Sequence, residues 1–344
     1  MRLRHCTAYA LGLLAAMAFG ASAQAPAKPG SEYTISGPFT HQNLAIYLLH
    51  GKDTISGKKL LTLQEALQQR IVIVHETGRV GRLAVQNLSA DSEVFIQAGD
   101  IVKGGRQDRV LAYDLIVPAR SGRVPIAAFC VEAGRWRKRG AENASRFSQS
   151  TGQLPGRALR LAVSSARQQR QVWQKVKQQQ DKLSMRLNKN VANSRSPSSL
   201  QLTLEDPDLK AKIDAYVTRL EKCIASKSNV VGFALTIRGK VEGAEVYGSS
   251  TLFRKMWPKL LRTAAVDAFS EYQQGRRYEL AENDEIHAFL ADGLHGKLVD
   301  GKQVDTNVSR RIKVTSRQTQ HTFFIESRDQ TQRGAVLHRT YIAR

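Results

Sequence analysis

A length of 344 residues and a formal net charge of +22 describe a long and strongly basic chain. Beyond the N-terminal segment, no apolar run approaches the roughly 20 residues that a membrane-spanning helix needs. These bounds exclude a membrane span and leave room for one large domain or for two to three smaller ones, by the usual range of domain sizes.

The N-terminal segment, residues 1–23, has the pattern of a secretory signal peptide. After two arginines, an apolar run extends from Tyr9 to Phe19, and small residues follow at positions 21–23. The apolar run is too short for a membrane anchor, and Cys6 lies too far from the cut for a lipoprotein anchor. We therefore expect cleavage after Ala23, a mobile N-terminus at 24–32, and a periplasmic or secreted mature protein.

The positive charge is concentrated in residues 135–195, where 15 Lys and Arg residues face only Glu142 and Asp181. Such a field favours anionic partners, for example nucleotides, phosphorylated envelope polymers or lipid head groups. Nucleic acid is not an expected partner of an exported protein. A solvated basic helix face explains the same composition, and the sequence leaves both interpretations open.

The N-terminal part, residues 33–136, is expected to be mostly antiparallel β-sheet. Its strand-like runs are rich in β-branched residues and are separated by Gly and Ser. The connections between them are too short for parallel crossovers. A capping box at 62–65 predicts a short helix that ends near residue 69. The expected strands are 33–49 (one or two strands), 71–74, 82–87, 94–97, 110–117 and 124–131.

The rest of the chain is expected to contain long amphipathic helices at 137–228 and a mixed α and β region at 229–344, so that the fold class is α+β. In the helical region, a loop at 137–157 precedes a helix from 157 or 161 to 187, and a connector at 189–205 precedes a helix from Asp206 to 224. The later expected elements are a hairpin at 229–247, a helix containing 260–269 that Pro258 starts or kinks, a helix at 284–291, and strands at 308–315, 322–326 and 335–342.

No familiar catalytic or metal-binding motif is present, and none of the eight histidines lies at metal-ligand spacing from another. The candidate catalytic acids or bases are three carboxylates near strand ends, Glu76, Asp108 and Glu132. Carboxylates at such positions also cap turns and pair with arginines, so a structural role stays open. No metal site is predicted, and no cofactor is identified.

Residues 99–136 hold the strongest candidate for a ligand site. Adjacent glycines let the backbone adopt positive φ and direct N–H groups at an anion, and nearby Lys and Arg side chains would add charge-assisted contacts. Arg135-Trp136 places a guanidinium beside an aromatic plane that can stack on a base. A Gly-Gly hairpin turn with solvated basic flanks is the alternative. The expected ligand-binding residues are Lys103, Gly104, Gly105, Arg106, Gln107, Arg109, Arg135 and Trp136.

An antiparallel hairpin of the two runs at 110–131 would bring Asp108, Arg109, Glu132 and Arg135 to the same end. The sequence therefore predicts two acids and two bases around one opening.

The combination of GDIVKGGRQDR, DLIVPA and FCVEAGRW resembles the signature of the ARG and Rhodanese-Phosphatase-superfamily-associated Protein domain family (ARPP). The resemblance extends from LTLQEAL at 61–67 through QVWQKV at 171–176 to the hairpin and helix at 230–270, so that residues 33–270 resemble the domain. The family has no established activity, and the domain associations in its name imply nucleotide or ADP-ribose chemistry. The matching positions are Glu76, Asn87, Gly99, Asp100, Gly104, Gly105, Gln107, Asp108, Arg109, Cys130, Glu132, Gly134, Arg135 and Trp136.

Two cysteines, Cys130 and Cys223, remain after the signal peptide is removed. Exported cysteines often pair, but Cys130 lies in an apolar strand, where a free cysteine behaves as a small hydrophobic side chain. The resemblance to a family with mostly intracellular associates further implies that Cys130 is a buried free thiol that does not pair with Cys223.

We therefore expect an exported protein that binds a small anionic ligand, such as a nucleotide, ADP-ribose or a phosphosugar, at 99–136, with hydrolysis left open. The alternative is a non-catalytic envelope module that docks its basic helix at 157–189 on an anionic polymer or a partner. Motif side chains around one concave pocket favour the first interpretation. A buried, mutually paired cluster without a cavity favours the second.

Overall fold

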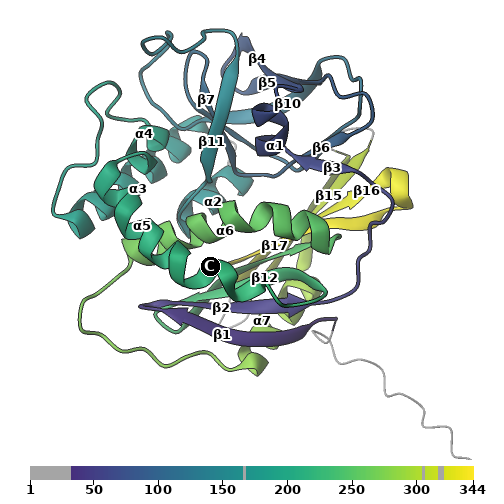
Figure 1. Ribbon diagram of the computed structural model, residues 1–344, viewed down its shortest axis with the longest axis vertical. Coiled ribbons are helices and arrows are strands. Elements are labelled where there is room, and N and C mark those ends of the chain that lie inside the picture. The colour runs from purple at the N-terminus through teal and green to yellow at the C-terminus, as the bar shows by residue number, and fades with distance from the viewer. Residues whose placement is uncertain (1–31, 166–167, 304–306, 317–320) are drawn as a thin grey trace, which may run out of the picture.

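A computed structural model describes residues 32–165, 168–303, 307–316 and 321–344. The expected signal peptide lies outside the described residues. The strands form an eight-stranded sheet and two smaller sheets of six and three strands. Figure 1 shows α6 (Ser250–Ser270) between the large sheet and the smaller ones. The chain is α+β, as the sequence predicts.

The eight-stranded sheet is antiparallel throughout and joins the two ends of the described chain. β2 pairs with β12, which is far along the chain, and not with the N-terminal strands that form the smaller sheets. β2 is buried on both faces, which suits an interior strand of a sheet that is covered on both sides. In spatial order, the strands are β1 (Thr34–His41), β2 (Leu44–His50), β12 (Val230–Ile237), β13 (Lys240–Tyr247), β17 (Ala335–Ala343), β16 (His321–Asp329), β15 (Val308–Ser316) and β14 (Lys297–Gln303).

The two faces of this sheet carry separate hydrophobic clusters. Leu44, Ile46 and Leu48 of β2 pack in the cluster that contains α6, whereas Tyr47 and Leu49 pack in the cluster that contains α7 (Asn283–His295). Alternate residues of a strand point to opposite faces, which explains this division. The α6 cluster also contains residues from the smaller sheets and from the helices at 169–220, so it connects all parts of the chain.

The smaller sheets carry the glycine-rich stretch at 99–136. Most of their pairings are antiparallel, and β3 with β6 is a parallel pair. The predicted strand at 110–117 is two short strands in different sheets, because the chain leaves one sheet at Leu111 and enters the other at Leu115. The strand order is β11 (Phe147–Gln153), β7 (Asp100–Gly104), β8 (Arg109–Leu111), β10 (Val124–Cys130), β5 (Arg82–Asn87) and β4 (Val72–Arg79) in one sheet, and β3 (Leu60–Thr62), β6 (Glu93–Ile96) and β9 (Leu115–Val117) in the other.

The predicted helix from 157 or 161 to 187 consists of α2 (Arg157–Ser165) and α3 (Gln169–Leu187). The helix predicted from Asp206 begins there and continues as a 3-10 turn at Glu221–Ile224. α6 begins at Ser250, so Pro258 lies inside the helix instead of starting it. The remaining helices are α1 (Leu63–Gln68), α4 (Leu200–Leu204), α5 (Pro207–Leu220) and the 3-10 turn Gln330–Gln332. In the described part of the chain, no helix is both long and apolar enough to cross a membrane.

Candidate functional site

The glycine pair of the motif forms a tight turn between β7 and β8. Gly104 and Gly105 both have positive φ, at 114° and 55°. A Cβ on Gly105 would lie 2.4 Å from Cζ of Phe147, so the ring of Phe147 requires glycine there. The N–H of Gly104 donates to Oδ1 of Asp108 at 2.9 Å. This N–H is therefore used inside the protein.

Two carboxylates and two guanidiniums make a buried ion cluster beneath this turn. We call Asp108, Glu132, Arg135 and Arg139 the motif cluster. Arg139 binds Asp108 through two contacts, Nη1 to Oδ2 at 2.9 Å and Nη2 to Oδ1 at 3.1 Å. Arg135 binds Glu132 in the same way, Nε to Oε1 at 2.6 Å and Nη2 to Oε2 at 2.7 Å. Asp108 and Glu132 are completely buried. Each negative charge is thus matched by a bidentate arginine.

The motif cluster also holds the connector that follows α3. Ser199 donates to Oδ2 of Asp108 at 2.7 Å, and Ser196 donates to Oε1 of Glu132. Burial would raise the pKa of Glu132, but hydrogen bonds from Arg135, Ser196 and the Asp108 N–H outweigh it and hold that pKa low. Glu132 therefore accepts these hydrogen bonds as an anion. The sequence gives no signal for Arg139, Ser196 and Ser199, because nothing separates them from the surrounding basic and Ser-rich runs.

A third buried guanidinium, that of Arg109, lies beside the motif cluster. Its Nη1 donates to Oε1 of Gln107 at 3.1 Å and to Sγ of Cys130 at 2.6 Å, and its Nη2 lies 3.5 Å from Oε2 of Glu76. Gln107 in turn donates to the carbonyl of Glu132 at 2.8 Å. The structure thus brings the predicted acids and bases to one end of the hairpin, where they face one another.

The two cysteines of the described residues, Cys130 and Cys223, are free thiols. Burial raises the pKa of Cys130 to about 11 against the opposing charge of Arg109, so the thiol is neutral near pH 7. Cys223 lies in the 3-10 turn that follows α5, against the α6 cluster.

Trp136 is the part of the motif that reaches solvent. It is 42% exposed, and the guanidinium carbons of Arg106 and Arg109 each lie 5.5 Å from the centre of its ring. Arg106 is exposed, whereas the predicted ligand residue Lys103 is held by Glu205 at 2.7 Å. The ring of Trp136 is therefore stacked and open at the same time.

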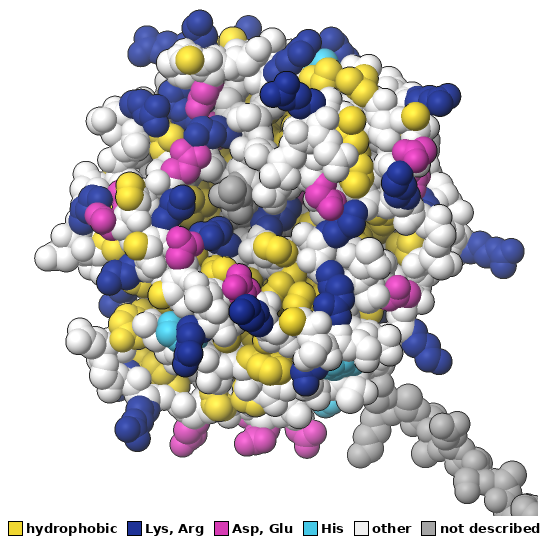
Figure 2. Space-filling model, in the orientation of Figure 1, with side chains coloured by type: hydrophobic (Ala, Val, Ile, Leu, Met, Phe, Trp, Pro, Cys, Tyr) yellow, Lys and Arg dark blue, Asp and Glu magenta, His cyan; other side chains and the backbone are white. Residues whose placement is uncertain are grey.

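Exposed cations lie on the segments next to Trp136, and in the described ranges they have no carboxylate within ion-pair distance. We call Trp136 and these residues the cationic surface. The hairpin tip at Gly78 approaches Arg106, and the backbone at 145–146 runs beside His75 and Glu76, which brings the set together. Figure 2 shows Lys and Arg side chains along the top edge of the molecule, where Figure 1 places β4 and β5. The cations are Arg79, Arg106, Arg137, Lys138 and Arg146.

The family model for the ARG and Rhodanese-Phosphatase-superfamily-associated Protein domain matches residues 32–342. The chain belongs to this family. The match covers the residues of the motif cluster and continues through the C-terminal strands, beyond the 33–270 of the sequence resemblance. Searches of curated proteins and of solved structures gave no match.

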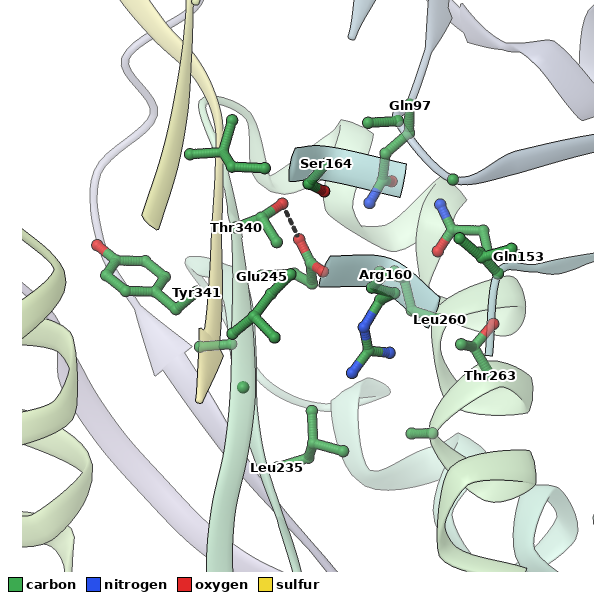
Figure 3. A pocket seen from close by; sticks show the side chains of 18 of the residues that line it. Gln97, Gln153, Arg160, Ser164, Leu235, Glu245, Leu260, Thr263, Thr340 and Tyr341 are labelled. Carbon is green, nitrogen blue, oxygen red and sulfur yellow. Dashed lines mark hydrogen bonds between the residues drawn. The ribbon is translucent and has the colours of Figure 1, made fainter. Parts of the chain in front are cut away.

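The main hollows of the ARPP chain lie away from the motif cluster. Figure 3 shows a narrow cavity between the large sheet, α2 and α6, with the polar side chains of Gln97, Arg160 and Glu245 in a mostly apolar wall. Its volume is about 40 Å³, which is room for a few water molecules at roughly 10–15 Å³ each. A groove of about 450 Å³ runs along α3 and meets the motif stretch only at Ala133.

Next to Glu245 of the cavity wall, the buried His338 joins the large sheet to the loop at 112–114 between the two smaller sheets. His338 lies 2.9 Å from Oδ2 of Asp114 and 2.9 Å from Oε2 of Glu245. Burial alone would lower the pKa of His338, but the two carboxylates outweigh it and raise that pKa to about 10. The described residues contain no group of three or more His, Cys, Asp or Glu side chains that could hold a metal ion.

Proposed function

We propose that this ARPP chain binds a small anionic ligand with a planar ring, such as a nucleotide or ADP-ribose, on the cationic surface. The observation that carries the proposal is the open ring of Trp136, stacked on Arg106, with exposed cations on the neighbouring segments that have no carboxylate partners in the described residues. A base can stack on the ring, and the phosphates can pair with the guanidiniums.

The motif cluster acts as the scaffold of this site. Asp108 and Glu132 neutralise Arg135 and Arg139, so these two arginines have little charge left for a ligand. Removing one partner of such a buried pair lowers the free energy of unfolding by about 3–5 kcal/mol. The motif cluster therefore fixes the position of the 131–139 segment. That segment positions Trp136 and the exposed cations Arg137 and Lys138.

The site is a surface and not an enclosed pocket, so both halves of the ligand are needed for measurable affinity. Stacking of one base on an aromatic side chain contributes about 1–3 kcal/mol. A hydrogen bond to a charged group contributes about 1.5–3 kcal/mol. A nucleoside gains only the first contribution, and a phosphosugar gains only the second. We therefore expect ADP-ribose to bind more tightly than adenosine or glucose 6-phosphate.

Isothermal titration calorimetry with these three compounds tests the proposal. Trp136→Ala should weaken ADP-ribose binding at least ~10-fold, about 1.4 kcal/mol, and leave glucose 6-phosphate binding nearly unchanged. Arg106→Ala should weaken both. Arg277→Ala, which removes an exposed arginine from the loop after α6, is the matched control. Equal effects of the three substitutions, or no binding by the wild type, would exclude a site at Trp136.

The alternative function is a non-catalytic envelope module, and the buried, mutually paired motif cluster is the observation that favours it. In this proposal the signal peptide exports the chain, and the exposed cations of α3 dock on an anionic polymer. Arg170 and Arg186 are exposed there, whereas Lys177 and Lys182 pair with acids of the protein itself. Binding to polyphosphate that falls steeply with salt and is lost in Arg170→Glu/Arg186→Glu would support this function.

A further inference from the structure

A second cleft lies between α2, α3, β13 and α6, with a volume of about 150 Å³. An engineered apolar cavity of about 150 Å³ takes up benzene, so this cleft has room for a small organic molecule. Its walls are polar and carry charges of both signs. The charged side chains that line it are Arg157, Lys175, Lys182, Arg238, Glu242, Asp267 and Glu271.

Each carboxylate of the cleft already has a cation. Glu242 pairs with Arg157 at 3.1 Å, and Asp267 pairs with Arg160 at 3.0 Å. Glu271 has two cations, Lys182 at 2.5 Å and Arg238 at 3.1 Å. The negative charges of the cleft are therefore fully matched before Lys175 is considered.

Lys175 is the surplus cation. Its Nζ donates to Oε1 of Gln178 at 3.0 Å, and no carboxylate of the described residues lies within ion-pair distance of it. Lys177, two residues along α3, points to solvent and pairs with Asp181. Both lysines lie in the same basic run of the sequence. Only the fold shows that Lys175 lines the cleft and Lys177 does not.

Gln179 supplies a donor that has no acceptor. The residue is 6% exposed, and its Nε2 is buried without a hydrogen-bond partner in the described part of the protein. Gly156, with φ +85°, lies so close that a Cβ there would be 2.8 Å from Oε1 of Gln179. The amide is thus held against the backbone at the wall of the cleft. Buried amide groups almost always have partners, so an unused one indicates a missing acceptor.

Burial disfavours the charged form of two of the acids that line the cleft. Burial raises the pKa of Glu242, and the charge of Asp267 adds to this effect against that of Arg157. Burial also raises the pKa of Asp267 against Arg160.

We infer that this cleft binds a small organic carboxylate, with Lys175 pairing with its charge and the Gln179 amide donating to one of its oxygens. The site shares no residue with the cationic surface around Trp136. A test of this site is therefore independent of a test of the proposed function.

Calorimetric titration of the full chain with acetate and with succinate tests the site. Lys175→Ala should weaken binding of both at least ~10-fold, and the matched control Lys177→Ala should not. Glu242→Gln, which keeps the shape and removes the negative charge, should tighten binding. Trp136→Ala should leave it unchanged.

Three results would overturn the inference: no binding of either carboxylate by the wild type, equal effects of Lys175→Ala and Lys177→Ala, or weaker binding by Glu242→Gln. Circular dichroism of each variant checks that the fold is intact. If Lys175→Ala does not fold, Lys175→Gln and Gln179→Met provide the same comparison.

Discussion

At the scale of single residues, the arginines of the motif divide into two kinds that the sequence does not distinguish. Arg109 and Arg135 are buried among carboxylates, a carbonyl-rich turn and a thiol, whereas Arg106 lies open on Trp136. In the sequence, all three arginines belong to the same pattern of glycine, charged and aromatic residues. Which of them is buried depends on how the 131–139 segment folds back over the turn, and that depends on distant partners such as Ser196 and Ser199.

The first prediction follows from this division. Arg135→Ala leaves the buried carboxylate of Glu132 without its bidentate partner, so the free energy of unfolding should fall by about 3–5 kcal/mol. Arg106→Ala removes an exposed charge and should change the free energy of unfolding by no more than about 1 kcal/mol. Urea denaturation of both variants measures the difference. A loss below about 1 kcal/mol in Arg135→Ala would mean that the buried pair has little structural weight.

At the scale of elements, the sequence predicts best where local chemistry decides. The capping box of α1 and the Asp206-Pro207 start of α5 are both confirmed. The start of α3 at Gln169 has no local signal, and Gln169 makes a tertiary contact there. The side chain of Gln169 accepts from the N–H of Cys130 at 2.8 Å and donates to its carbonyl at 2.7 Å, as a neighbouring strand would. The sequence predicts a loop where the structure has β11, because FSQSTGQ lacks the β-branched pattern of a strand. The segment is a strand because it pairs with β7.

The second prediction concerns the start of α5. The carboxylate of Asp206 accepts from the N–H groups of Asp208 at 3.0 Å and Leu209 at 3.1 Å. Asp206→Ala should lower the free energy of unfolding by about 1 kcal/mol, within the usual range of about 0.5–2 kcal/mol for a lost helix cap. Asp206→Asn should restore most of this loss, since asparagine caps as well as aspartate. If Asn and Ala are equally destabilising, the effect comes from the ion pair with Lys189 and not from the cap. Thermal unfolding monitored by circular dichroism distinguishes the two.

At the scale of the whole molecule, the chain is closed by contacts between its ends. β2 pairs with β12, and the loop that carries Asp114 binds β17 through His338 and β16 through Ser327. None of these contacts has a local signal, because each joins residues 180 or more positions apart whose neighbours look like ordinary strands. The sequence therefore predicts the strands of the large sheet except β14, and it does not predict their order.

The last prediction concerns the pH dependence of stability that the buried His338 causes. Its pKa is raised from 6.5 in the unfolded chain to about 10 in the folded protein, because Asp114 and Glu245 favour the charged imidazole. A raised pKa means that the folded state holds the proton more tightly. The resulting stabilisation is complete below pH 6.5 and disappears as the pH rises through 10. Each tenfold gain in proton affinity on folding corresponds to about 1.4 kcal/mol of stability.

We therefore expect the free energy of unfolding, measured by urea denaturation, to fall by a few kcal/mol between pH 7 and pH 10. His338→Gln should be less stable than the wild type at pH 7, because the charges of Asp114 and Glu245 then lack their partner. Its stability should depend less on pH over this range, since no group at position 338 titrates. Lysine deprotonation near pH 10 affects both proteins alike, so the difference between their slopes isolates the histidine. Equal slopes would show that His338 is neutral in the folded protein, and that the large sheet and the Asp114 loop are joined by hydrogen bonds to a neutral imidazole instead of an ion triad.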